Sequence, residues 1–77
     1  MHTDSTSHRI CGVVNKLLAD AGVSQKRAAE TTGIPRATLL RRLSGATPFH
    51  TTELAAIANL LGINVSDIIL AAENEAA

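Results

Sequence analysis

Apolar residues recur every three or four positions in several short blocks of this sequence, and a glycine follows most of the blocks. The longest block places six such residues on one stripe, at Ile10, Val13, Val14, Leu17, Leu18 and Ala21. This spacing is that of one face of an amphipathic α-helix. Phe49 is the single aromatic residue, so the core must be built from Leu, Ile, Val and Ala side chains. We therefore expect an all-α protein without strands.

The same pattern predicts five short helices over residues 8–21, 25–32, 35–43, 52–61 and 65–72. Residues that favour helix N-caps precede four of them, and these expected caps are Ser7, Ser24, Thr51 or Thr52, and Asn64. Proline is well placed in the first turn of the third helix, where Pro35 lies. The 77 residues suffice for one small domain. We expect it to cover residues 7–72, between a disordered polar tail at 1–6 and a loose acidic tail at 73–77.

Several functional classes are excluded on composition and motif content. The longest apolar run, 68–72, is far shorter than the roughly 20 residues that span a bilayer. The N-terminus lacks the basic and apolar regions of a secretory signal. Cys11 is the single cysteine and cannot form an internal disulfide, which favours a reducing cytosol. A helical domain this small rarely encloses a substrate pocket, so we expect neither an enzyme nor a small-molecule or cofactor site.

Histidines are the remaining candidates for metal chemistry. His2, His8 and His50 lack the spacing of metal ligands. We expect them to be surface or tail residues, with no metal site.

A very short turn containing Gly33 joins the second and third expected helices. Such a connection forces two helices to cross steeply, as in a helix-turn-helix, although ordinary helix hairpins share it. The segment 25–45 resembles the DNA-binding motif of the Cro/CI (XRE-type) family, which includes phage Cro proteins and repressors. The matching positions are Gln25, Ala29, Gly33, Ile34, Leu39 and the Ser44-Gly45 stop. The flanking helices extend the resemblance over residues 8–72.

The resemblance implies a compact five-helix domain of the lambda-repressor-like fold that binds double-stranded operator DNA in a bacterial cytoplasm. Its third helix would present Pro35, Arg36, Ala37 and Arg41 to base edges in the major groove. Arginine can bind guanine through two hydrogen bonds, and Ala37 and Pro35 could contact a thymine methyl group. For Arg36 and Arg41, the alternative is ordinary solvated charge on an exposed helix face.

Other residues are candidates for contacts to the phosphate backbone. Gln25 lies at a helix N-terminus, where free N–H groups and the helix dipole favour phosphate. The remaining candidates are Lys26, Thr38, Arg42, Ser44 and Thr47. For Ser44 and Thr47, turn formation is an equal explanation.

Arg42 departs from the family pattern, which has an apolar residue at its position. We expect Leu43 to take the core role, while Arg42 pairs with Glu30 or Glu53 or reaches a phosphate.

The expected function is a sequence-specific transcriptional regulator, most simply a Cro-like phage repressor that occupies an operator and blocks polymerase. Two-fold dimers commonly read such operators. The candidate dimer interface is Ile68, Ile69 and Leu70, since three contiguous apolar residues cannot all face one core. A monomer that meets its partner only on DNA is equally allowed. The alternative function is a protein-interaction module, antitoxin-like or anti-repressor, that kept this fold without binding DNA.

Charge is unevenly distributed although it sums to zero. Seven Lys and Arg residues balance seven Asp and Glu residues, which taken alone argues against a nucleic-acid partner. Residues 24–45, however, hold five basic residues against Glu30, whereas residues 46–77 hold four acidic residues and no basic one. We therefore expect a basic DNA-binding surface joined to an acidic remainder, with weak non-specific binding.

Overall fold

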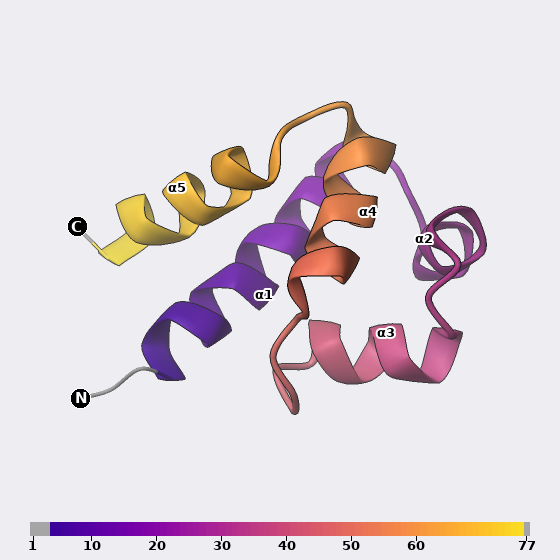
Figure 1. The fold of residues 1–77 in the computed structure, drawn as a ribbon, viewed down its shortest axis with the longest axis horizontal. Helices are drawn as coiled ribbons and strands as arrows, with labels where there is room; N and C mark the ends of the chain where they lie inside the picture. Colours follow the sequence, from indigo (N-terminus) through magenta and orange to yellow (C-terminus); the bar gives the residue numbers. More distant parts are fainter. Residues whose placement is uncertain (1–3, 77) are drawn as a thin grey trace.

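The computed structural model describes the backbone of residues 4–76 and the side chains of residues 8–75. Five helices follow one another: α1 (Asp4–Asp20), α2 (Gln25–Thr32), α3 (Arg36–Leu43), α4 (Thr51–Leu61) and α5 (Val65–Ala76) (Figure 1). The described residues form no strand. The all-α prediction is confirmed.

The outer helices reach further than the sequence predicts. Helix α1 begins at Asp4, so the expected cap at Ser7 is wrong, and residues 4–6 of the expected tail are helical. An acidic residue at a helix start is favoured by the helix dipole. Helix α5 continues to Ala76 and takes in most of the expected acidic tail, because Ala and Glu favour helix and no glycine or proline interrupts them. Residues 1–3 and 77 lie outside the described residues.

The ends of α2 follow the prediction. Ser24 adopts an extended conformation, and its Oγ accepts a hydrogen bond of 3.1 Å from the backbone N–H of Arg27. At the other end Gly33 has a φ of 79°, and its N–H donates to the carbonyl of Ala29. This left-handed conformation ends a helix without the steric cost that a Cβ would bring. Helix α2 therefore ends at this turn, and α3 begins only three residues after Gly33.

The cap of α4 differs from the prediction. His50, rather than Thr51 or Thr52, is the N-cap residue, with an extended backbone. The backbone N–H of His50 donates to Oε1 of Glu53 at 2.8 Å, so the carboxylate three residues on stabilises the helix start. At the start of α5, the N–H of Asn64 donates to Asp67 in the same way at 2.9 Å. Pro35 likewise precedes α3 as its N-cap instead of lying within the first turn.

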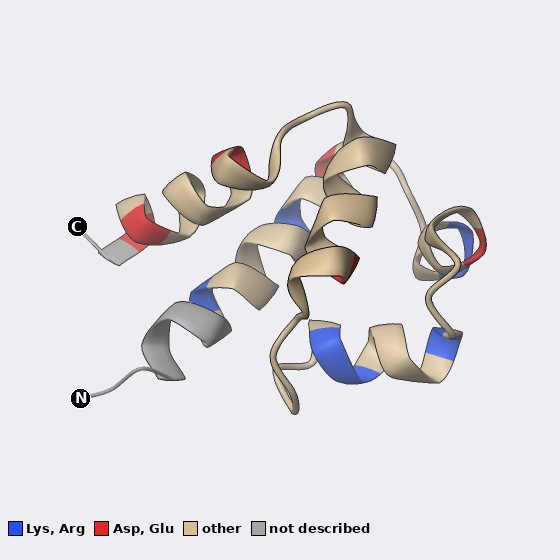
Figure 2. Ribbon diagram, in the orientation of Figure 1, with Lys and Arg blue, Asp and Glu red and all other residues tan. Residues whose placement is uncertain are grey.

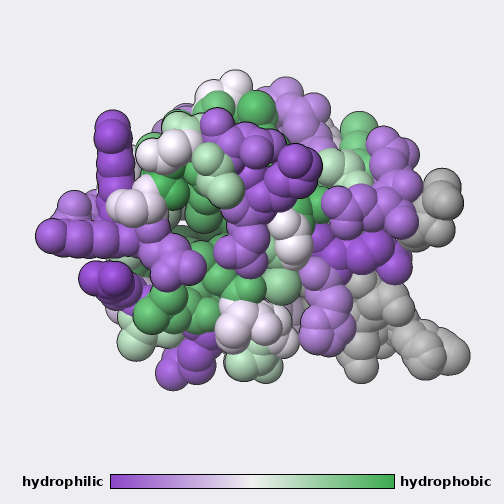
Figure 3. Space-filling view, turned by 180° about the vertical axis from the view of Figure 1, so that it is seen from behind, coloured by the Kyte–Doolittle hydropathy of each residue, from purple (hydrophilic) through white to green (hydrophobic). Residues whose placement is uncertain are grey.

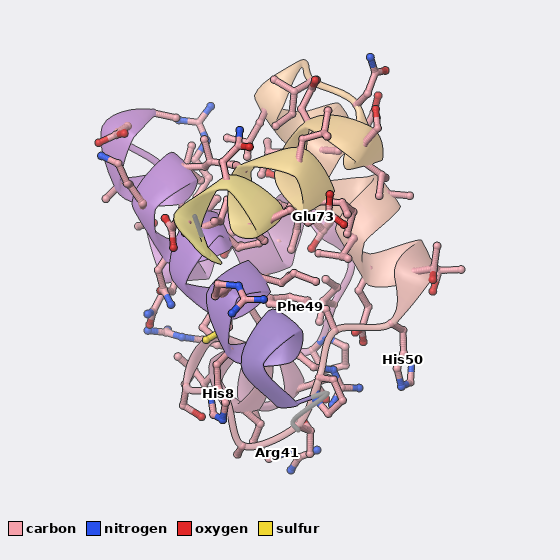
Figure 4. All side chains as sticks on the ribbon, turned by 90° about the vertical axis from the view of Figure 1, so that its left-hand side faces the viewer. His8, Arg41, Phe49, His50 and Glu73 are labelled. Atoms are coloured by element: carbon pink, nitrogen blue, oxygen red, sulfur yellow. The ribbon has the colours of Figure 1, made fainter. Side chains whose placement is uncertain are left out.

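The core is aliphatic and draws on all five helices. Its largest fully buried side chains are Val14, Leu39, Ile57 and Ile68. Phe49, in the loop between α3 and α4, packs against this core, as Figure 4 shows from the side. Leu40 is the exception among the leucines of α3, because it is 40% exposed. The helix thus buries Leu39 and Leu43 and turns the residue between them to solvent.

Helix α5 lies beside α1, and both ends of the described chain are at the same side of the molecule (Figure 1). The Nε of Arg9 on α1 donates to the carbonyl of Ala72 on α5 at 3.0 Å. Helices α2 and α3 form the opposite end. This arrangement places α2 and the start of α3 away from the chain termini, whereas Gly45, just after α3, lies beside His8 of α1.

Candidate nucleic-acid interface

Helix α3 has one buried side and one solvent-exposed side. Leu39 and Leu43, one turn apart, are buried. Four residues of the helix are exposed to solvent, namely Arg36, Ala37, Leu40 and Arg41. Thr38 is half-buried. Since the two leucines anchor the helix in the core, the rotation of α3 about its axis is set, and its outer face presents two arginines.

Arg42, near the end of α3, forms an ion pair with Glu53 on α4. Nε of Arg42 donates to Oε1 of Glu53 at 2.8 Å, and Nη2 donates to Oε2 at 3.2 Å. The side chains are only 11% and 14% exposed. A bidentate arginine–carboxylate pair fixes orientation as well as distance. It therefore holds the C-terminal end of α3 against the start of α4.

This pair selects one of the three interactions expected for Arg42. Its guanidinium meets Glu53, not Glu30, and its Nη1 also donates to Oγ1 of Thr47 at 2.6 Å. An arginine engaged in this way is poorly available for phosphate, because leaving Glu53 would strand a mostly buried carboxylate. We therefore assign Arg42 to positioning α3 in place of the expected phosphate contact.

The pair also shifts the titration of both partners. The hydrogen bonds from Arg42 lower the pKa of the Glu53 carboxyl below its ordinary value and outweigh burial, which acts in the opposite direction. The backbone hydrogen bond from His50 adds to this lowering. The hydrogen bond to Glu53 raises the pKa of the Arg42 guanidinium. Both groups are therefore charged at neutral pH.

Asn15 is a residue that the sequence analysis missed. Its Nδ2 donates to the carbonyl of Leu43 at 2.9 Å and to that of Cys11 at 3.0 Å. Carbonyl groups at the end of a helix lack hydrogen-bond partners within that helix. Asn15 of α1 therefore provides a donor for one carbonyl at the end of α3. The one signal in the sequence is that asparagine is a poor residue for a helix interior, which does not reveal its partner.

The hydroxyl groups after α3 already have intramolecular partners. Ser44 Oγ donates to the carbonyl of Arg41 at 2.9 Å and accepts from the N–H of Ala46 at 3.4 Å. Thr47 accepts from Arg42. The bonds of Ser44 support its turn-forming alternative, whereas the hydroxyl of Thr47 supports Arg42. Contact of either residue with phosphate stays a prediction.

The start of α2 offers a second exposed segment. Gln25, Lys26 and Arg27 are all exposed. The first N–H groups of a helix have no partner within it, and Ser24 satisfies only that of Arg27. Gln25 and Lys26 thus combine polar side chains with free backbone donors, the arrangement that suits a phosphate oxygen.

The uneven charge distribution in the sequence is also a separation in space. Figure 2 shows Lys and Arg at both ends of α3 and on α2, whereas the acidic residues of α5 lie at the other end of the molecule. In the side view of Figure 4, Arg41 lies at the lower edge of the molecule, and Glu73 lies well above it, beyond Phe49. From behind, hydrophilic side chains project from the α2–α3 end around smaller hydrophobic areas (Figure 3). A polyanion would meet least repulsion at the α2–α3 end.

The three residues of the candidate dimer interface have different environments. Ile68 is fully buried, Ile69 is half-buried, and Leu70 is 55% exposed. Ile68 belongs to the core of its own chain and must be removed from the expected interface. Leu70 alone is open to a partner.

The described residues show neither a metal-ligand cluster nor a single helix that could cross a membrane. No group of three or more His, Cys, Asp and Glu side chains there could hold a metal ion; His8 and His50 are exposed, and His2 lies outside the described residues. No single described helix is long and apolar enough to span a membrane, and α4 and α5 pass that test of length and composition only together, across a bend of 101°.

Helices α2 and α3 define the class of the domain. Figure 1 shows α2 nearly end-on while α3 lies across the page, so the pair is steeply crossed about the Gly33 turn, as in a helix-turn-helix. Residues 14–71 match the model of the Cro/C1-type helix-turn-helix DNA-binding domain. The chain belongs to this family, and the resemblance drawn from its sequence is confirmed. No curated protein and no solved structure matches it.

Proposed function

We propose that this DNA-binding protein is a sequence-specific transcriptional repressor of the Cro-like phage type. The single observation that carries the proposal is the outer face of α3. It presents Arg36 and Arg41 to solvent, while Leu39, Leu43 and the Arg42–Glu53 pair hold the helix from behind. A rigidly held helix with exposed arginines is suited to reading guanine in the major groove.

The contacts divide into two kinds under this proposal. Arg36 and Arg41 read guanine, and Ala37 and Pro35 contact thymine methyl groups. Gln25, Lys26 and Thr38 contact phosphates and set the position of the domain, with Ser44 and Thr47 as further candidates. The protein has a binding rather than a catalytic role.

Repression would be steric, because a domain seated over a promoter excludes polymerase. Operators of this kind have two half-sites about one helical turn apart, read by a dimer. Leu70 on α5 is the apolar residue open to such a partner, since it is 55% exposed. The site of action would be the bacterial cytoplasm, on the nucleoid.

The competing function is a protein-interaction module without sequence-specific DNA binding. Such a module would be expected to present an apolar or acidic face on α3. The exposed face instead carries two arginines, with Lys26 and Arg27 on the neighbouring helix, which favours DNA.

A mobility-shift and footprinting assay on the DNA flanking the protein's own gene, at two salt concentrations, tests the proposal. We expect a discrete footprint and an affinity that falls steeply with salt, because binding to phosphates releases counterions. No footprint together with a flat salt response would favour the interaction module.

A further inference from the structure

Leu40 is a large apolar side chain on the exposed face of α3, which also carries Arg36 and Arg41. It is 40% exposed, whereas its neighbours Leu39 and Leu43 are buried. Apart from it, Leu70 on α5 is the one other large apolar side chain in the described part of the chain with comparable exposure. The core does not need Leu40, and the ion pair and caps around α3 do not use it.

The position of Leu40 around α3 gives it a role in relation to the arginines. Each residue of a helix advances by about 100°. Measured around the helix axis from Arg36, Leu40 therefore lies at about 40°, Ala37 at about 100° and Arg41 at about 140°, all in the same direction. The two apolar side chains occupy the middle of the exposed face, with one arginine on each side.

This order matters for what the face can recognise. The two arginines can each donate to guanine, but Leu40 and Ala37 have no side-chain donor or acceptor and cannot pair with a polar base edge. The apolar group that the major groove offers is the C5-methyl group of thymine. Placing the leucine against a methyl group removes apolar surface of both from water.

We infer that Leu40 is a specificity-determining residue that contacts a thymine methyl group, and that the half-site has an A·T pair between the guanines read by Arg36 and Arg41. This inference rests on the proposed sequence-specific binding. It adds a residue to the base contacts proposed above, and it gives the order of base types in the site.

The test replaces thymine by uracil, which lacks only the C5-methyl group. A binding site is first selected from random duplex DNA with the unaltered protein, and each thymine in it is then replaced in turn. We expect one replacement within the half-site to weaken binding by about three- to fivefold, the effect of losing one buried methyl group. In Leu40→Ala, the same replacement should have little effect.

Asn74→Ala is the control, because it removes an exposed side chain of α5, away from α3 and outside the proposed DNA and dimer contacts. It should keep the uracil sensitivity of the unaltered protein. The folding of Leu40→Ala is checked by its circular dichroism and thermal unfolding, and little change is expected at an exposed helix position that gains alanine.

The outcomes distinguish a failure of the Leu40 inference from a failure of the proposed sequence-specific binding. If selection enriches no sequence, the proposed function fails. If a site is enriched but uracil has the same effect on Leu40→Ala as on the unaltered protein, the assignment of Leu40 is overturned. A change in self-association of Leu40→Ala with unchanged uracil sensitivity would also overturn it, and would make Leu40 a protein contact.

Discussion

Single side chains of α3 have sharply different tasks although they are adjacent. Arg41 is exposed and Arg42, the next residue, is held by Glu53 with 11% of its side chain exposed. The 100° step of the helix separates them: one faces solvent and the other faces α4. Substitutions at these two positions should therefore change different properties.

Arg36→Ala and Arg41→Ala should each relax sequence preference without unfolding the domain. Loss of a bidentate arginine–guanine contact costs about 1–3 kcal/mol of discrimination at one base pair. Competition binding with single-base variants of the selected site measures this loss. Unchanged discrimination in both variants would refute the assignment of these arginines as base readers.

Glu53→Gln should lower the thermal stability at neutral pH by several degrees. Glutamine still accepts the hydrogen bond from the N–H of His50, so the change removes mainly the charge opposite Arg42. Asp20→Asn is the matched control. It breaks the exposed Lys16–Asp20 pair, whose side chains are 71% and 63% exposed, and exposed pairs contribute at most about 1 kcal/mol.

The same pair predicts how stability depends on pH. The pKa of Glu53 is lowered in the folded state, so its contribution is complete above the ordinary pKa of glutamate, near 4.3. It is lost as pH falls through the lowered value. As pH falls from neutral to about 3, the thermal stability of the unaltered protein should decrease more steeply than that of Glu53→Gln. Parallel curves for the two proteins would contradict this role for the pair.

At the scale of elements, the geometry of the α2–α3 pair depends on one turn. Gly33 has a φ of 79° and lets α3 start close to the end of α2. At the start of α2, Ser24 accepts a hydrogen bond from the N–H of Arg27. At the end of α3, Asn15 from α1 donates one to the carbonyl of Leu43. The motif is thus held by contacts from outside it as well as by its own turn.

Gly33→Ala should destabilise the protein by about 1–2 kcal/mol, the cost of a left-handed conformation for a residue with a Cβ. Gly12→Ala is the control with the opposite sign. Gly12 lies within α1, and a Cβ there would meet no atom within 4 Å. Gly12→Ala should stabilise the protein by up to about 1 kcal/mol, because alanine favours helix more than glycine does. Denaturant unfolding measures both, and equal effects would disprove the turn argument.

At the scale of the whole molecule, zero net charge conceals a basic end and an acidic end. The acidic residues of α5 lie away from α3 (Figure 2). At 0.1 M salt the screening length is about 10 Å, so these charges should have little influence on DNA held at α3. At low salt they should reduce its long-range attraction to DNA.

Reversing two charges on α5, with Glu73→Lys and Glu75→Lys, should therefore strengthen non-specific binding at low ionic strength and change it little near 0.15 M salt. Lys26→Ala is the contrasting variant, because it removes a charge beside the proposed phosphate contacts. It should weaken binding to all sequences and reduce the salt dependence by about one unit in slope. Fluorescence anisotropy with random duplex DNA over a salt series measures both variants. An equal gain at both salt concentrations in the α5 variant would contradict this account.

Local patterns in the chain were enough to predict five helices, the Gly33 turn, the Ser24 cap and the family. These features depend on neighbouring residues, since apolar periodicity, caps and turn glycines act within a few positions. The limits of α1 and α5 and the cap of α4 were predicted less well, because Ser, Thr and Ala are acceptable at several adjacent positions near a helix end.

The partners of individual side chains depended on how the helices pack. For Arg42 the sequence left open two carboxylates, Glu30 and Glu53, and a phosphate; it pairs with Glu53, eleven positions away on another helix. Asn15 reaches Leu43 across 28 positions. Packing also decided that Ile68 is buried while Leu40 is exposed. Apolar residues look alike in sequence, and only the packing of α3 and α5 against the core determines which of them remain on the surface.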